Sequence, residues 1–167
     1  MGLIFNDDAY YSGSEYRARQ HFVEYAKQIM NDRGIRPWYA AYYVEVNDTT
    51  FGQAMKGQRF LGPIKLIMIA ELFECTVNEM LGYESVDVPT RTRLFDSGFD
   101  TKKVIDYFSD RLSEKVNRID IDELARAIKL TVPTVTRYIE GDMLPDTAIL
   151  IRICDYLDCT PSELLGY

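Results

Sequence analysis

The feature that most constrains this chain is an internal repeat. Residues 79–83 (EMLGY) return as residues 163–167 (ELLGY), 84 positions further along the 167-residue sequence. At the same shift, and without a gap, identical residues recur across predicted helices and turns. Self-similarity at a fixed shift indicates two copies of one structural unit. The identical pairs include Ala41/Ala125, Thr50/Thr134, Gly57/Gly141, Ile67/Ile151, Ile69/Ile153, Cys75/Cys159, Thr76/Thr160, Glu79/Glu163, Leu81/Leu165, Gly82/Gly166 and Tyr83/Tyr167.

The second copy predicts a string of short helices. Val104, Phe108 and Leu112 follow the three-to-four-residue spacing of an amphipathic helix, which we expect over residues 102 to about 117. Further helices are expected over residues 121–128 and 132–140. A fourth helix follows the N-cap Asp146, and a capping box begins at Thr160 and opens a last turn.

The first copy repeats this plan, so the predicted fold class is all-α. Its first helix is expected over residues 15–32, and Pro37 opens the second. Asn47 caps the third, Pro63 follows the opening Gly62 of the fourth, and Thr76 starts a capping box. The predicted organisation is a tail (1–14), a divergent first domain (15–83), a linker (84–101) and a second domain (102–167). Three apolar residues of the linker, Leu94, Phe95 and Phe99, predict that part of it docks on a domain.

The charge balance excludes a protein that binds polyanions by global attraction. The chain has 19 basic and 26 acidic side chains, a net charge of −7. Residues 1–83 hold 8 basic and 10 acidic residues, and residues 84–167 hold 11 and 16. Any contact with nucleic acid must therefore be local.

The sequence offers little evidence for a membrane protein, a metal site or an enzyme. No apolar run could span a membrane and the N-terminus lacks the pattern of a signal peptide, so we expect a cytoplasmic protein without a membrane partner. Cys75, Cys154 and Cys159 have no metal-ligand spacing and His21 is the single histidine. We therefore expect reduced core cysteines, no metal and no cofactor. A Gly-rich phosphate loop and a nucleophile–histidine arrangement are also missing, which argues against an enzyme.

The second copy carries a family resemblance. Residues 124–141 (LARAIKLTVPTVTRYIEG), Leu144 and Pro145, and residues 155–165 (DYLDCTPSELL) resemble the Cro/cI (Xre-type) helix-turn-helix family. The resemblance covers residues 102–167 well and residues 15–83 more loosely. It implies two lambda-repressor-like bundles in tandem, joined by a linker. It also implies a repressor-like, sequence-specific transcriptional regulator of bacterial, phage or mobile-element origin that binds double-stranded DNA.

The resemblance also implies where DNA binds. In the family the third helix enters the major groove, with the residues of its N-terminal part at the base edges. Arg137 is the expected main base contact, because an arginine can pair bidentately with guanine. The implied DNA-binding residues are Arg126, Lys129, Thr131, Val132, Pro133, Thr136 and Arg137 in the second copy, and Asn47, Thr49, Gln53, Lys56 and Arg59 in the first.

Acidic residues depart from the expected pattern and leave an alternative open. Asp48 and Gly52 lie on the expected groove face of the first copy, and whether this copy reads bases stays open. Asp142 follows the third helix of the second copy, and Asp120, Asp122 and Glu123 crowd the start of its second helix. The alternative is a protein-binding module of the anti-defence or antirepressor type, whose acidic helical faces antagonise a basic, nucleic-acid-binding protein.

Aromatic residues are concentrated in and before the first copy. Either they form its core under the N-terminal tail, or they form a surface for self-association, since Tyr and Trp favour interfaces. The second option predicts a homodimer through the first copy. The residues are Tyr10, Tyr11, Tyr16, Phe22, Tyr25, Trp38, Tyr39, Tyr42 and Tyr43.

Overall fold

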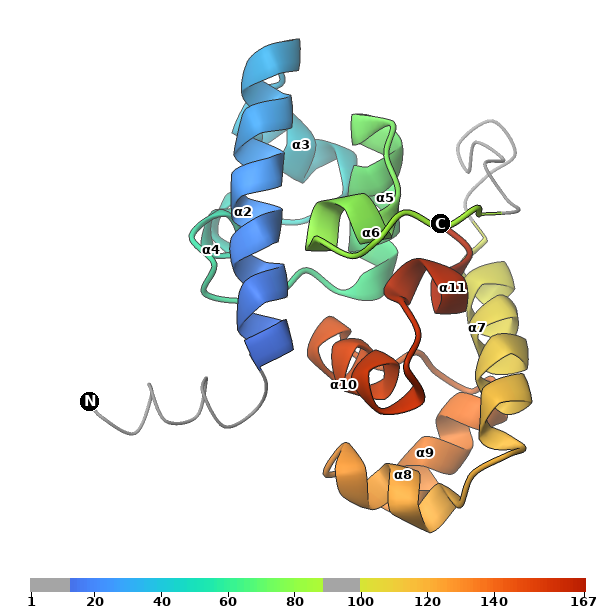
Figure 1. Cartoon of the computed structure of the whole chain (residues 1–167). Coiled ribbons are helices and arrows are strands. Elements are labelled where there is room, and N and C mark those ends of the chain that lie inside the picture. Colours follow the sequence, from blue (N-terminus) through green and yellow to red (C-terminus); the bar gives the residue numbers. More distant parts are fainter. Residues whose placement is uncertain (1–12, 89–99) are drawn as a thin grey trace. The chain divides into compact units, whose positions relative to one another are not determined.

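The protein is described here by a computed structural model that covers residues 13–88 and 100–167. Within these residues all regular secondary structure is helical, as the sequence predicts (Figure 1). The chain divides into two compact units, which we call the N-terminal unit (Met1–Ser85) and the C-terminal unit (Val86–Tyr167). The N-terminal unit contains α2 (Gly13–Arg33), α3 (Pro37–Tyr43), α4 (Asp48–Met55), α5 (Pro63–Phe73) and α6 (Val77–Leu81). The C-terminal unit contains α7 (Thr101–Val116), α8 (Ile121–Ala127), α9 (Val132–Ile139), α10 (Thr147–Leu157) and α11 (Pro161–Leu165).

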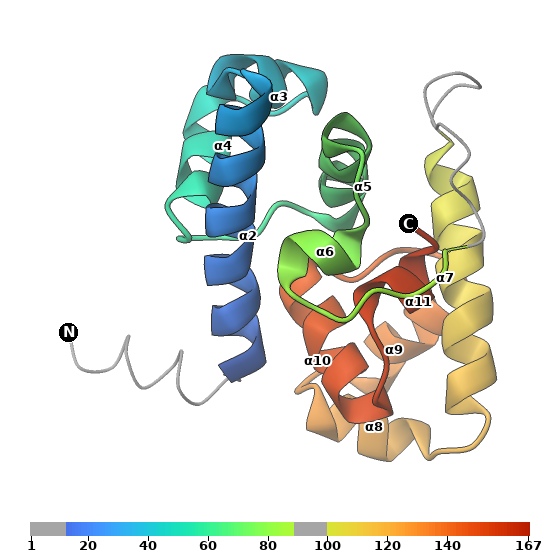
Figure 2. The same ribbon diagram turned by 45° about the horizontal axis from the view of Figure 1, so that its top comes forward.

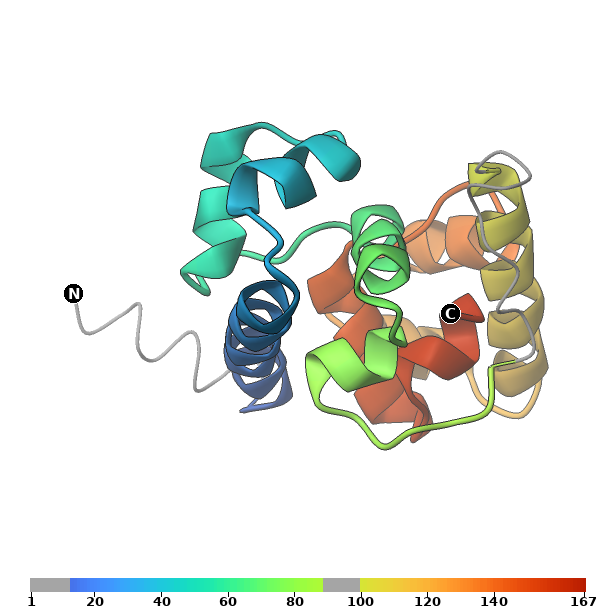
Figure 3. The same cartoon turned by 90° about the horizontal axis from the view of Figure 1, so that it is seen from above.

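The two units have the same helices in the same order and at equivalent positions. The bounds of α8 to α11 are those of α3 to α6 shifted by 84 residues. The same pairs of helices are in contact: the long first helix (α2 or α7) packs on the third and the last helix of its own unit, as Figures 2 and 3 show. Left-handed backbone recurs at equivalent positions as well. The pairs are Glu45/Lys129, Gly57/Gly141, Glu74/Asp158 and Gly82/Gly166.

The predicted helix starts are confirmed by side-chain hydrogen bonds. Asn47 Oδ1 accepts a bond from the Thr50 backbone N–H (2.7 Å), and Asp146 Oδ1 accepts one from Ile149 N–H (2.9 Å). Thr76 and Thr160 each open a complete capping box. Each of these bonds satisfies a backbone donor that a helix start leaves without a partner.

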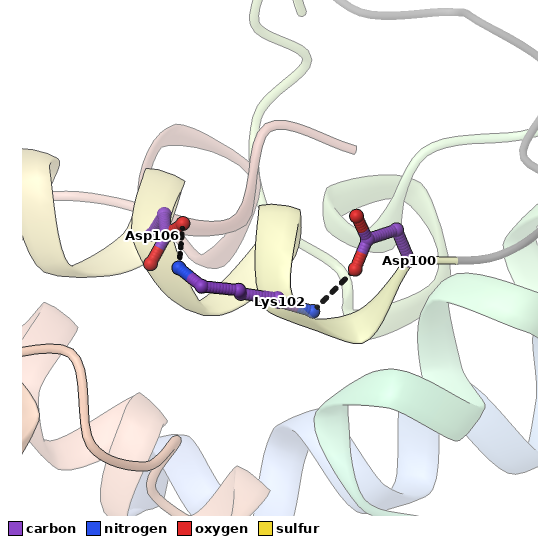
Figure 4. A network of polar contacts seen from close by, with 3 residues as sticks. All are labelled: Asp100, Lys102 and Asp106. Carbon is purple, nitrogen blue, oxygen red and sulfur yellow. Dashed lines mark hydrogen bonds and ion pairs between the residues drawn. The ribbon is translucent and has the colours of Figure 1, made fainter.

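The helix α7 begins at the edge of the predicted linker. The Asp100 carboxylate accepts a bond from the Lys102 backbone N–H (3.0 Å) and so starts the helix at Thr101. Lys102 Nζ then pairs with Asp106 one turn later at 2.6 Å (Figure 4). The hydrogen bond with Asp106 raises the pKa of Lys102. Leu94, Phe95 and Phe99, which the sequence predicts to dock, lie outside the described residues.

The last turn of each unit packs against its first helix at a glycine. Gly82 and Gly166 both have φ +80°, and a Cβ at either would lie 2.8 Å from His21 Cγ or 2.9 Å from Tyr107 Cε1. His21 Nδ1 also lies 3.0 Å from the Met80 carbonyl oxygen. Only glycine combines this backbone with this close approach.

The aromatic residues of the N-terminal unit correct one prediction. Phe22 is buried, and Tyr25 and Tyr43 are half-buried. Tyr16, Trp38, Tyr39 and Tyr42 are exposed, so the prediction that they build the core is wrong within the described residues. Positions 38, 39 and 42 correspond to the exposed polar residues Asp122, Glu123 and Arg126 at the 84-residue shift. The rings at 38, 39 and 42 therefore lie on an outward helix face, and Tyr10 and Tyr11 lie outside the described residues.

Candidate nucleic-acid interface

A tight turn joins α8 to α9 in the C-terminal unit. Lys129 adopts left-handed backbone (φ +58°), and the Leu130 N–H donates to the Ala125 carbonyl at 2.9 Å. Ala125 is buried, and its small side chain suits the close contact between the two helices. The turn sets the direction of α9 relative to α8, which is the arrangement of a helix-turn-helix unit.

The inner side of α9 is fixed against the unit. Val135 and Tyr138 are buried, and burial is the main cause that raises the pKa of Tyr138. At the end of α9 the Ile139 carbonyl accepts hydrogen bonds from the hydroxyls of Ser109 and Ser113 on α7. Buried apolar contacts and hydrogen bonds to α7 therefore hold α9 at its middle and at its C-terminal end.

The outer side of α9 is open to solvent. Val132, Pro133 and Arg137 are exposed, and Thr136 is partly exposed. These residues follow the helical spacing that places them on one face, opposite Val135. The structure thus brings together on one surface all four residues of α9 that the sequence predicts to bind DNA.

Most hydrogen-bonding groups on this face already have partners within the helix. The Thr136 hydroxyl donates to the Val132 carbonyl at 2.9 Å. Thr131 Oγ1 caps the helix: it lies 2.9 Å from Thr134 Oγ1 and accepts from the Thr134 N–H at 3.4 Å. Arg137 remains the side chain with the longest reach and the most donors on this face.

Arg137 has one acidic neighbour. Its Nε lies 3.9 Å from Asp142 Oδ2, and the two side chains are 59% and 53% exposed. An ion pair that is this long and this exposed contributes little free energy in water. The guanidinium can therefore exchange Asp142 for a base or phosphate acceptor at small cost.

The two ends of α8 carry opposite charges. Arg126, in the last turn of α8, and Lys129, in the turn, are exposed cations near the start of α9. At the first turn of α8 the Asp120 carboxylate caps the helix (2.9 Å to Asp122 N), and Asp122 and Glu123 are exposed. This acidic end of α8 repels phosphate.

Tyr156 of α10 extends the acidic end of α8. Its hydroxyl donates to Glu123 Oε2 at 3.4 Å. Desolvation raises the pKa of Tyr156, and the carboxylates of Glu123 and Asp120 raise it further. The tyrosine is thus a neutral donor that holds Glu123 in place beside α8.

The corresponding surface of the N-terminal unit has the opposite charge pattern. Glu45 occupies the left-handed turn position that Lys129 occupies in the other unit, and Asp48 is exposed in the first turn of α4. Thr49 is exposed and Gln53 partly exposed. Lys56 and Arg59, which the sequence predicts to bind DNA, are exposed beyond the end of α4 and do not share its first turn.

Gly52 leaves an open space beside α4. A Cβ at this position would meet no atom within 4 Å. A groove of about 720 Å³ runs here, with Met30, Trp38, Phe51, Gly52 and Met55 among its lining residues. Trp38 and Tyr42 on α3 are 64% and 77% exposed. These rings form an aromatic edge on the surface, which is one of the two alternatives that the sequence leaves open, and the 84-residue shift to exposed polar positions favours it.

The comparison with family models concerns the C-terminal unit. Residues 115–167 match the Cro/C1-type HTH DNA-binding domain. The match begins in the last turn of α7 and covers α8 to α11, about a third of the chain. It indicates a DNA-binding regulator, in agreement with the open face of α9. The chain has no match among the curated proteins or the solved structures that were compared.

Two further features are not found among the described residues. None of their helices is both long enough and apolar enough to cross a membrane. Within residues 13–88 and 100–167, no group of three or more His, Cys, Asp or Glu side chains could hold a metal ion.

Proposed function

We propose that this chain is a sequence-specific, repressor-like transcriptional regulator that binds double-stranded DNA. The observation that carries the proposal is the open face of α9, within a segment that matches a DNA-binding helix-turn-helix domain. In this account α9 enters the major groove and Arg137 pairs with a guanine. Val132 and Pro133 offer apolar contact to a thymine methyl group.

Residues around α9 supply the remaining contacts in this proposal. Arg126 and Lys129 are exposed cations that neutralise phosphates, which gives affinity without sequence preference. Thr131, at the helix cap, lies close to the backbone of the bound strand. Because Asp120 and its acidic neighbours disfavour phosphate at the start of α8, the proposed footprint is confined to the last turn of α8, the turn after it and α9.

We also propose that the two units are tandem copies of the same helix-turn-helix domain. The shared helix bounds, left-handed positions and capping boxes support this proposal. The proposed contacts of the N-terminal unit are Asn47 at the N-cap of α4 and Thr49 and Gln53 on α4, with Lys56 and Arg59 at phosphates. Asp48, Glu45 and the space at Gly52 make it the weaker reader of the two.

Selection from a pool of random duplexes tests the proposal. The full chain is titrated with labelled duplexes at low and near-physiological salt, and the retained DNA is sequenced. We expect saturable binding that salt weakens and an enriched motif. Arg137→Ala should lose enrichment at one base position, whereas Lys103→Ala, which removes the same charge from the first turn of α7, should keep it. The absence of any binding at low salt would contradict the proposal.

The acidic start of α8 favours a second candidate function. Asp120, Asp122, Glu123 and the hydrogen-bonded Tyr156 form a negatively charged surface in the C-terminal unit. Such a surface fits a basic protein partner, so the chain would antagonise a nucleic-acid-binding protein. Binding to a basic protein that Asp122→Asn and Glu123→Gln abolish, together with no binding to duplex DNA, would establish this function instead.

The exposed aromatic edge of α3 supports a homodimer. Trp38, Tyr39 and Tyr42 expose large rings on one short helix, and such residues are enriched at interfaces. Light scattering at micromolar concentration should give twice the mass of the chain, and Trp38→Ala with Tyr42→Ala should give the monomer mass. A monomeric wild-type protein would rule out this interface.

A further inference from the structure

Two of the three cysteines meet at the end of α10 in the C-terminal unit. The helix ends at Leu157, and Asp158 adopts left-handed backbone (φ +51°, ψ +54°). The Cys159 N–H then donates to the Cys154 carbonyl at 3.0 Å. In this type of helix ending, the side chains of the two bonded residues come into contact.

The two thiols interact. Each of Cys154 and Cys159 shifts the pKa of the other, and neither cysteine is in a disulfide. A disulfide needs α carbons about 4.4–6.8 Å apart. The direct hydrogen bond between the two backbones holds the α carbons close together, as a disulfide requires.

The N-terminal unit lacks this pair and so provides an internal comparison. There the Cys75 N–H donates to the Ala70 carbonyl at 2.9 Å in the same helix ending. Ala70 stands where the C-terminal unit has Cys154. The backbone arrangement is therefore common to both units, whereas the second thiol belongs to the C-terminal unit.

We propose that Cys154 and Cys159 are an oxidation site that forms an intramolecular disulfide when the protein meets a peroxide. Cys159 is the attacking residue because it is 9% exposed whereas Cys154 is 1% exposed. The hydrogen bond from Cys154 lowers the pKa of the Cys159 thiol, and the positive charge of Lys115 lowers it further. Burial raises the pKa of Cys154, which therefore stays a thiol until the second step.

The reaction balances in two steps with hydrogen peroxide. The Cys159 thiolate attacks one peroxide oxygen, an S–O bond forms, the O–O bond breaks and the leaving hydroxide takes up a proton. The Cys154 sulfur then attacks the sulfenic sulfur of Cys159. An S–S bond forms, the S–O bond breaks, and the hydroxyl leaves as water with the proton of Cys154. Two thiols thus lose two electrons and two protons, and the peroxide becomes two molecules of water.

Mass spectrometry of the full chain tests this proposal. The reduced protein is treated with hydrogen peroxide, blocked with iodoacetamide and digested without reductant. We expect a loss of two hydrogen atoms, a bond between Cys154 and Cys159, and alkylation of Cys75 alone. Dithiothreitol should restore three alkylated cysteines.

Three variants assign the roles. Cys154→Ala, which copies Ala70 of the other unit, should accumulate a sulfenic acid at Cys159 that dimedone traps. Cys159→Ala should give neither the disulfide nor the adduct at Cys154. Cys75→Ala should form the disulfide as the wild type does. Alkylation of both Cys154 and Cys159 in the peroxide-treated wild type, oxygen added to either one without an S–S bond, or a disulfide that contains Cys75 would overturn the proposal.

Discussion

The two units have the same helix bounds from their second to their last helix, but the charges on these helices and on the turn between them differ. In the C-terminal unit the turn carries Lys129, and α9 starts with uncharged residues. In the N-terminal unit the turn carries Glu45, and α4 starts with Asp48. At the preceding helix the difference reverses: α8 starts with acidic residues, whereas α3 starts with Pro37 and Trp38 and no acid.

The residues that the two units share differ in location from those that have diverged. Buried apolar residues, helix caps and left-handed turn positions recur between the units, because they determine where each helix begins, ends and packs. The exposed residues on α3, α4, α8 and α9 have diverged. A shared backbone therefore predicts a shared fold and leaves DNA binding to be tested in each unit.

The largest expected effect concerns a position that the units share. Gly82→Ala and Gly166→Ala each force a side chain into left-handed backbone and against a ring. We expect each to lower the free energy of unfolding of its unit by about 2–4 kcal/mol, as the sum of the backbone penalty and overpacking. Urea unfolding measures this loss. A loss below about 1 kcal/mol in only one of the units would show that the positions of Gly82 and Gly166 are not equivalent.

The second largest expected effect compares how much each unit contributes to DNA affinity. Arg137→Ala should weaken binding to the selected duplex by about 1–3 kcal/mol, since it removes a bidentate contact to guanine. Gln53→Ala, at the equivalent position of α4, should cost less than Arg137→Ala, because Asp48 and the space at Gly52 make this face the weaker reader of bases. Fluorescence anisotropy measures both. Equal losses would mean that both units read bases.

A charge exchange in the turn should make the N-terminal unit bind DNA more as the C-terminal unit does. Glu45→Lys places a lysine at the position equivalent to Lys129. Both positions have left-handed backbone, so the conformation need not change. We expect DNA affinity to rise by about 1 kcal/mol at low salt and the salt slope to steepen by about one phosphate contact. Glu24→Lys on α2 is a control with the same charge change. If both variants raise affinity equally, the effect is one of net charge and the turn has no special role.

The smallest expected effect concerns the space beside α4. Gly52 has no contact that a Cβ would violate and no left-handed backbone. Gly52→Ala should therefore raise the free energy of unfolding by about 0.5–1 kcal/mol through helix propensity. Urea unfolding compares this variant with the wild type. A destabilised variant would indicate that the groove beside Gly52 is needed by the folded unit.

Much of the fold was predictable because its signals are local. The caps Asn47 and Asp146 and the capping boxes at Thr76 and Thr160 are short-range hydrogen bonds that residue type and spacing encode. The sequence pattern predicted α7, α8 and α9 to within one residue at each end. The open face of α9 followed from the same spacing, because the buried Val135 fixes which side is exposed.

Other features could not be predicted because they depend on tertiary geometry. Residue type does not reveal that Lys129 and Glu45 adopt left-handed backbone, since glycine is the usual residue there. The pairing of Arg137 with Asp142 and the bond from the Thr136 hydroxyl to its own helix depend on side-chain conformation. The aromatic residues left a core and a surface role open, and the position of α3 exposes Trp38 and Tyr42.

The most direct test of the central claim asks whether Arg137 binds one particular atom of the DNA, the N7 of a guanine. In the selected duplex, each guanine is replaced in turn by 7-deazaguanine, which lacks the N7 acceptor, and affinity is measured for the wild type and for Arg137→Ala. We predict one position at which the replacement weakens the wild type by about 1.5 kcal/mol or more, the free energy of a hydrogen bond to a charged donor, and leaves the variant unchanged. Equal sensitivity of the two proteins at every guanine would contradict the placement of α9 in the major groove.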